Sequence, residues 1–138
     1  MIKRILIAYD GSESADKAFR LALSLAKEHH ASLSVLAVSR PPDFAEDVET
    51  EAIIENSQRH YRKLLSALKP QAASEGIDAQ FEVRVGHPAE QIIYYAEKNL
   101  VDLIVVGHRG HSFFERLRLG SVSRQIIDYA NCAVLVAR

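Results

Sequence analysis

Three glycines and a serine near the C-terminal end of the chain have a spacing suited to holding phosphate. Gly107, Gly110, Gly120 and Ser121 lie in the stretch GHRGHSFFERLRLGS, directly after the apolar residues LIVV. Glycines allow the backbone to approach a ligand closely and to adopt positive φ angles. Backbone N–H groups at a helix N-terminus bind anions, and the helix dipole favours negative charge there. We therefore expect a phosphate site in this loop and at the helix that follows it, with Ser121 as the helix N-cap.

A second polar segment, Asp10-Gly11-Ser12, follows the first apolar run of the chain. Ser12 is predicted to cap a helix, because apolar residues recur after it at helical spacing. Asp10 has two interpretations: its carboxylate contacts a ligand, or it serves only as a turn residue.

Other signatures of catalysis are absent from the sequence. There is no G-x-G-x-x-G, no G-x-x-x-x-G-K-[ST] and no G-x-S-x-G, which argues against a dinucleotide dehydrogenase, a P-loop NTPase and a serine hydrolase. His108 and His111 form an H-x-x-H pair without a third ligand nearby, so we predict no protein-bound metal. Cys132 precedes an apolar run and is interpreted as a core residue.

Composition narrows the class of protein. The chain has 138 residues, of which 48% are hydrophobic, and a net charge of −1. We expect a single domain over residues 1–138 with no global affinity for nucleic acid. Its apolar runs are shorter than the roughly 20 residues that span a membrane. A lone cysteine fits a reducing compartment, so we expect a cytoplasmic protein.

Five apolar runs alternate with helical patterns along the chain. The runs predict strands over Ile5–Tyr9, Leu33–Val38, Gln80–Val85, Leu103–Val106 and Ala133–Ala137. This alternation indicates an α/β fold with an open parallel sheet and helices on both faces. Polar residues alternate with apolar ones in the third run only, as expected of a half-exposed edge strand. Right-handed crossovers then favour the strand order 3-2-1-4-5.

The predicted helices have recognisable starts and one internal breaker. A long helix is expected from about residue 43 to residue 74, with a kink or an early end at Pro70. Pro88 is expected to begin another helix. The last helix is expected after Gly120, with Val122, Ile126 and Ile127 directed inward.

The strand order has two consequences. Strands 1 and 4 are neighbours whose crossovers run in opposite directions, and ligands bind beyond the C-terminal ends of such strands. The segments at Asp10 and at Gly107 would meet there. The last strand, Ala133–Ala137, is an apolar edge, and a bare apolar edge invites pairing. We therefore expect a homodimer formed through this strand.

Together, the motifs resemble those of the universal stress protein family. The spacing G-x2-G-x9-G-S at Gly107, Gly110, Gly120 and Ser121 is similar to that family's ATP-binding signature. The opening strand ending in YDGSE, the GxP at Gly86, and the segments VVGHRG and LGSVS extend the similarity over the whole chain. The resemblance implies an adenine nucleotide alpha hydrolase-like fold, the order 3-2-1-4-5 and dimerisation through the last strand.

The resemblance also implies a nucleotide site. Asp10 would lie near adenosine and Val38 near adenine, while the signature glycines and Ser121 would hold ribose and phosphates. The full predicted set is Ala8, Tyr9, Asp10, Val38, Val106, Gly107, Arg109, Gly110, Gly120, Ser121, Val122 and Ser123. ATP, or AMP or ADP, is the implied ligand, with Mg²⁺ held between the phosphates.

Two positions depart from the family pattern, and three functions stay open. Many members have proline where this chain has Ala133, and position 9 is often smaller than Tyr9, which would stack on adenine or crowd it. The first hypothesis is an ATP-binding stress or signalling module without a catalytic residue. The second is a slow ATPase or an adenylyl-transferring enzyme on the same fold. The third is a dimerisation module that binds no nucleotide.

Overall fold

The computed structural model describes residues 1–42, 48–108 and 119–138. Its helices are α1 (Glu13–His29), α2 (Val48–Ser74), α3 (Pro88–Lys98) and α5 (Ser121–Tyr129). Its strands are β1 (Arg4–Ala8), β2 (Ser32–Ser39), β3 (Ala79–Val85), β4 (Leu103–Gly107) and β5 (Ala133–Ala137). Both ends of each strand lie within one residue of the ends of the apolar run that predicts it.

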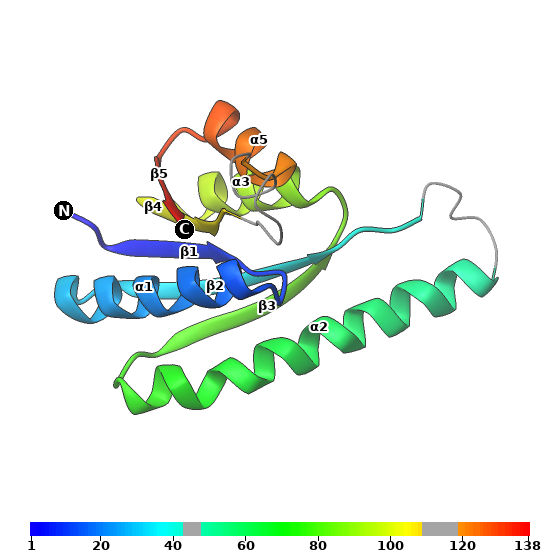
Figure 1. Cartoon of the computed structure of the whole chain (residues 1–138), viewed down its shortest axis with the longest axis horizontal. Coiled ribbons are helices and arrows are strands. Elements are labelled where there is room, and N and C mark those ends of the chain that lie inside the picture. Colours follow the sequence, from blue (N-terminus) through cyan, green and yellow to red (C-terminus); the bar gives the residue numbers. More distant parts are fainter. Residues whose placement is uncertain (43–47, 109–118) are drawn as a thin grey trace.

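The strands form one parallel sheet in the order β3-β2-β1-β4-β5, as the sequence predicts. Figure 1 shows α1 and α2 on one face of this sheet and α3 and α5 on the other. The central strands β1 and β4 are buried on both faces, which explains their continuous apolar sequences.

Two apolar cores fix the helices on the sheet. On one face, Phe19 of α1 and Leu65 of α2 pack with Ile5, Ile7 and Val35 of the strands. On the other face, Ile92 of α3 and Ile126 of α5 pack with Leu6, Leu36 and Ile104. Alternate residues of each strand thus serve opposite cores, because successive side chains of a strand point to opposite faces.

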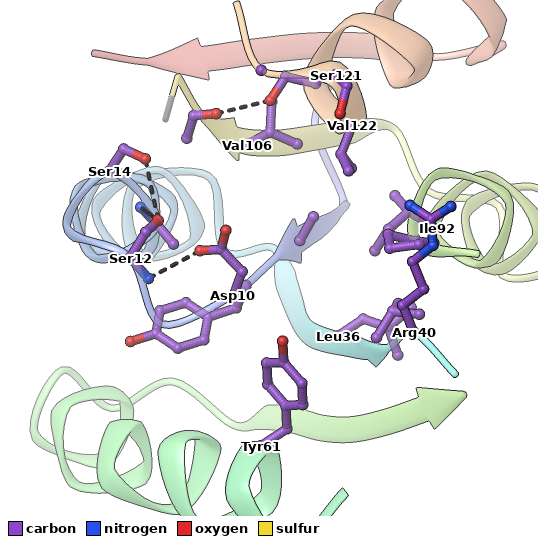
Figure 2. Close-up of a pocket in the computed structure, with 18 residues that line it drawn as sticks. Asp10, Ser12, Ser14, Leu36, Arg40, Tyr61, Ile92, Val106, Ser121 and Val122 are labelled. Carbon is purple, nitrogen blue, oxygen red and sulfur yellow. Dashed lines mark hydrogen bonds between the residues drawn. The ribbon is translucent and has the colours of Figure 1, made fainter. Parts of the chain in front are cut away.

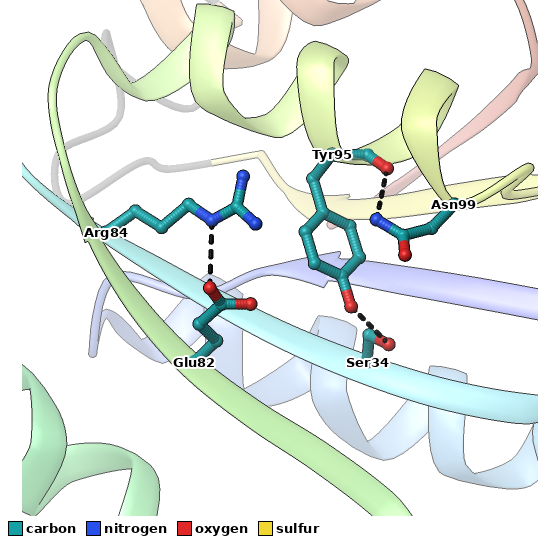
Figure 3. Close-up of polar contacts among 5 residues, drawn as sticks. All are labelled: Ser34, Glu82, Arg84, Tyr95 and Asn99. Carbon is teal, nitrogen blue, oxygen red and sulfur yellow. Dashed lines mark hydrogen bonds and ion pairs between the residues drawn. The ribbon is translucent and has the colours of Figure 1, made fainter.

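The polar face of the edge strand β3 is tied to α3 by a short chain of contacts (Figure 3). Arg84 donates from Nε to Glu82 at 3.0 Å, and its guanidinium carbon lies 5.0 Å from the centre of the Tyr95 ring. The Tyr95 hydroxyl bonds to the Ser34 hydroxyl at 3.1 Å. Glu82 remains 48% exposed, so the charged side chains lie where this face of the edge strand is open to solvent.

The sequence predicts a kink or an early end at Pro70. The early end is wrong, because α2 continues through Pro70 to Ser74. Leu68 and Ala72 are buried on either side of the proline. Their burial stabilises the helical path beyond the one backbone hydrogen bond that proline removes. Residues 43–47, where the sequence predicts the helix to begin, lie outside the described residues.

The last helix also differs from the prediction. Ile126 is fully buried, but Ile127 is 44% exposed and does not join the core. None of the described helices has both the length and the apolar character that crossing a bilayer would require.

Candidate functional site

A cleft of about 260 Å³ opens where β1 and β4 end. This is the point at which the crossovers of the sheet change direction, and the carboxyl ends of the strands border it. Figure 2 shows side chains from β1, β2, α1, α2, α3 and α5 around it. Its walls include ten of the twelve residues that the sequence analysis selects: Ala8, Tyr9, Asp10, Val38, Val106, Gly107, Gly120, Ser121, Val122 and Ser123.

The backbone of Val38 faces the cleft because β2 is longer than its neighbour β1. The Tyr9 N–H donates to the Leu36 carbonyl at 2.9 Å, and the Gly86 N–H donates to the Ser39 carbonyl at 3.0 Å. Alternate residues of a strand direct their N–H and C=O groups to opposite sides, so Val38, like Leu36, faces β1. Pairing with β1 ends at Leu36, and no backbone bond to Val38 from that side exists within the described residues. Val38 therefore presents one donor and one acceptor to the cleft.

One wall of the cleft is apolar. It is formed by the side chains of Ala8, Leu36, Val38, Ile92, Val106 and Val122. These side chains belong to, or pack against, the core between the sheet and the helices α3 and α5. Such a wall suits a flat apolar group, while the polar groups around it fix orientation.

The opposite wall contains the start of α1, whose N-terminus is capped by a side chain. Ser12 accepts a hydrogen bond from the Ala15 N–H at 3.1 Å, and Asp10 accepts one from the Ser12 N–H at 2.9 Å. Glu13 and Asp16 place negative charge in the first turn. This helix end therefore disfavours a further anion. Asp10 is a turn residue and also borders the cleft, so both of its interpretations stay compatible with its position.

The start of α5 is different and corrects the predicted cap. Gly120, not Ser121, is the N-cap, so no side chain closes this helix end. The first intrahelical bond runs from the Arg124 N–H to the Gly120 carbonyl at 2.9 Å. The N–H groups of Ser121, Val122 and Ser123 precede it and have no partner in the helix. No acidic residue lies in this turn, so the helix itself places no negative charge at its positive end, which borders the cleft.

Gly107 and Ser123 hold this end of α5 in place. The Ser123 hydroxyl donates to the Gly107 carbonyl at 2.9 Å, and its side chain is buried. A Cβ atom at Gly107 would lie 2.6 Å from the backbone carbon of Ser14. The glycine is thus required by the close approach of β4 to the first turn of α1, whatever it contacts in a ligand.

Tyr9 borders the cleft but directs its hydroxyl to α1. Its side chain is 6% exposed, and the hydroxyl donates to Asp16 at 2.5 Å. Burial, followed by the hydrogen bond to Asp16 and the negative charges of Asp16 and Asp10, raises the pKa of Tyr9 well above its usual range. The Tyr9 hydroxyl therefore stabilises the packing of β1 against α1 rather than facing the cleft.

We predict that Tyr9→Phe lowers the free energy of unfolding by about 1 kcal/mol at pH 8. The variant should also lose less of its stability than the parent chain as the pH rises above 10. Since the folded pKa lies above the unfolded value near 10, the hydroxyl stabilises the fold fully below pH 10 and progressively less above it. Urea unfolding between pH 8 and pH 11 should give a shallower decline for the variant than for the parent chain. Tyr129→Phe, which alters an exposed tyrosine, is the control. Equal slopes for Tyr9→Phe and the parent would contradict the assignment.

Two selected residues lie outside the described part of the chain, and the lining residues that were not selected include two with large polar side chains. Arg109 and Gly110 lie outside the described residues. Arg40, just after β2, and Tyr61 of α2 line the cleft. The alternation of β2 could have flagged Arg40, but the helical stripe containing Tyr61 predicts only core packing. In the part of the chain that the structure describes, no three His, Cys, Asp or Glu residues form a metal-binding group.

Fold and cleft together define an open α/β protein with a cleft at the switch point of the sheet, where proteins of this class bind ligands. The chain belongs to the universal stress protein family, whose model matches residues 1–138. Among curated proteins, universal stress protein YxiE of Bacillus subtilis is 34% identical, with all of both chains covered. Universal stress protein MJ0531 of Methanocaldococcus jannaschii is also 34% identical, over all of this chain and 83% of its own length.

Solved structures agree with the family assignment. Universal stress protein UspA of Lactobacillus plantarum superimposes with a TM-score of 0.90 at 26% identity, covering 99% of this chain and 98% of its own. A universal stress protein in complex with cAMP has a TM-score of 0.77 at 22% identity, with 99% and 97% covered. An Archaeoglobus fulgidus member in complex with dAMP has a TM-score of 0.68 at 22% identity, with both chains fully covered. These last two likenesses show the shared fold.

Proposed function

We propose that the chain binds ATP in this cleft and acts as a nucleotide-responsive stress or signalling module. The observation that carries the proposal is the pairing of two unsatisfied backbone features in one cleft. The uncapped start of α5 offers N–H groups to phosphate, and Val38 offers a donor and an acceptor to a base.

The base would lie against the apolar wall and be read by Val38. The Watson–Crick edge of adenine carries one acceptor, N1, beside one donor, the N6 amino group. An N–H and a C=O from one strand residue complement that pair. The guanine edge carries a donor at N1 and an acceptor at O6, which is the reverse order. Adenine is therefore the purine that the Val38 backbone favours.

The phosphates would lie at the start of α5 because the two helix ends differ. The start of α1 is capped and bears acidic residues, whereas the start of α5 has neither. Gly107, Gly120 and Ser121, with Arg109 and Gly110, would surround the phosphates. Mg²⁺, which usually binds through phosphates and few protein ligands, would be held by the nucleotide itself.

Relatives support a nucleotide, and the described site favours binding over turnover. The related structures contain cAMP or dAMP, which share the adenine base and a phosphate with ATP. Asp10 is the only carboxylate lining the described part of the cleft, and one of its oxygens accepts from the Ser12 backbone. We accordingly propose a cytoplasmic binding module of a single domain rather than an enzyme.

Calorimetry tests the proposal directly. ATP, ADP and AMP, each with and without Mg²⁺, should bind the full chain at one site, and GTP should bind more weakly. Nucleotide released by denaturing freshly purified protein should be identified as an adenine nucleotide by mass spectrometry. The absence of heat with every adenine nucleotide at millimolar concentration would overturn the proposal.

We also propose that β5 pairs with β5 of a second copy. β5 is an edge strand, and its central residues Val134, Leu135 and Val136 remain partly exposed. Pairing of two such strands would satisfy the free backbone groups and cover the apolar side chains.

Leu135→Glu is predicted to shift the protein from the mass of two chains to 15.4 kDa in sedimentation velocity. A charge at this position would have to be desolvated in the paired strands. Tyr94→Glu places the same charge on α3, at a side chain that is 54% exposed, and should leave the mass unchanged. Circular dichroism should show that both variants are folded. A folded Leu135→Glu variant that remains dimeric would move the interface elsewhere.

A further inference from the structure

Arg40 continues the row of β2 side chains that face the cleft. Leu36 and Val38 point to this side of the sheet, and Arg40 is the next residue of the same parity. Figure 2 shows its side chain reaching toward Ile92 of α3, on the other side of the cleft from Ser12 and Ser14. Within the described residues, its guanidinium has no hydrogen bond and no ion pair.

The neighbouring arginine, Arg84, differs from Arg40 in its contacts. Arg84 pairs with Val38 across β2 and β3, so both arginines lie close to the same residue. Arg84 is held by Glu82 and lies over Tyr95 (Figure 3). Arg40 makes neither kind of contact with a described residue, so no described partner occupies its guanidinium donors at the cleft.

Tyr61 places a second free polar group at the same end of the cleft. Its ring packs against the core beneath α1 and α2, while its hydroxyl points into the cleft between Asp10 and Leu36 (Figure 2). No described residue accepts from or donates to this hydroxyl. Tyr61 is half-buried, so its hydroxyl at the cleft is accessible to a ligand.

We propose that Arg40 and Tyr61 recognise the nucleoside half of the bound nucleotide. This inference rests on the proposed function and adds the residues that set its specificity. The planar guanidinium of Arg40 would stack on the purine beside Val38, and the Tyr61 hydroxyl would bond to the base or the ribose.

The test separates the nucleoside from the phosphates. Affinities of adenosine, AMP, ATP and tripolyphosphate are measured by calorimetry for the parent chain, Arg40→Lys and Tyr61→Phe. Arg40→Lys keeps the charge and removes the plane, so adenosine, AMP and ATP should each weaken by about tenfold. Tyr61→Phe should weaken the same three ligands by about fivefold. Tripolyphosphate binding should not change in either variant.

Arg84, the neighbouring arginine, offers a matched control. Arg84→Lys changes the neighbouring arginine outside the cleft and should leave all four affinities unchanged. If Arg40→Lys weakens ATP and tripolyphosphate but not adenosine, Arg40 contacts phosphate and the inference is wrong. Unchanged affinities in both cleft variants would also overturn it while leaving ATP binding intact. If the parent chain itself binds no adenine nucleotide, the proposed function fails first.

Discussion

Ser121→Asp should lower ATP affinity by about 100-fold while leaving the fold as stable as before, or slightly more so. An aspartate in the first turn of a helix interacts favourably with the dipole and contributes roughly 0.3–1 kcal/mol of stability. Ser121 is exposed, so the new carboxylate remains hydrated in the free protein. The same charge would stand where we propose that the phosphates bind. Two like charges about 4 Å apart repel by roughly 1–4 kcal/mol near a protein surface, and a 100-fold loss, about 2.7 kcal/mol, lies within that range.

The opposite signs make this variant informative, because a damaged fold cannot produce them. Urea unfolding reports stability, and calorimetry reports the affinities of ATP and adenosine. Ser121→Asn has the same shape without the charge and should retain ATP binding within about threefold. Raised salt should restore part of the affinity of Ser121→Asp, since screening weakens charge repulsion. Undiminished ATP affinity in Ser121→Asp would place the phosphates away from α5.

The strand order could be predicted because the apolar pattern of each strand reflects whether one or both of its faces are buried. Continuous apolar residues placed β1 and β4 at the centre, and alternation placed β3 at an edge, as the structure confirms. The residue at which backbone pairing between two strands stops cannot be predicted from such a pattern. β2 extends beyond the end of β1, which leaves the β1-facing backbone groups of Val38 unpaired. This difference in length depends on where the turn at Asp10 leaves the sheet.

Helix ends and helix faces were predicted less well. Glycine and serine are both good N-caps, and only the backbone geometry distinguishes Gly120 from Ser121. Ile126 and Ile127 are chemically alike, but adjacent side chains lie about 100° apart around a helix, and only Ile126 faces the core. Pro70 was expected to kink the helix or to end it early, and the helix does not end there because buried residues on both sides stabilise it.

Residues with two functions are the hardest to interpret from sequence. Gly107 fits the spacing of a phosphate signature, yet the structure gives it a steric reason of its own. Tyr61 fits a core stripe, yet its hydroxyl faces the cleft. In both residues the pattern identifies one role, and only the packing of distant elements brings out the other.

Gly107→Ala is expected to lower stability by about 3 kcal/mol, the upper end for overpacking a well-filled site. The added Cβ would lie 2.6 Å from the backbone carbon of Ser14 and 2.7 Å from its carbonyl oxygen. Backbone atoms cannot rotate away as a flexible side chain can. Movement of Gly107 is opposed as well, because its carbonyl accepts from Ser123 and its strand pairs with Ala137. Relief therefore requires α1 to separate from β4.

Gly76→Ala separates this steric effect from the general loss of a glycine. Gly76 has a φ of +70°, and a Cβ there would meet nothing within 4 Å. Its replacement should cost only about 1 kcal/mol, from the left-handed backbone. Thermal unfolding should show a fall of about 10 °C for Gly107→Ala and about 3 °C for Gly76→Ala. Equal falls would mean that α1 yields to the methyl group. Separation of α1 from β4 would also widen the cleft, so ATP affinity should fall in Gly107→Ala and persist in Gly76→Ala.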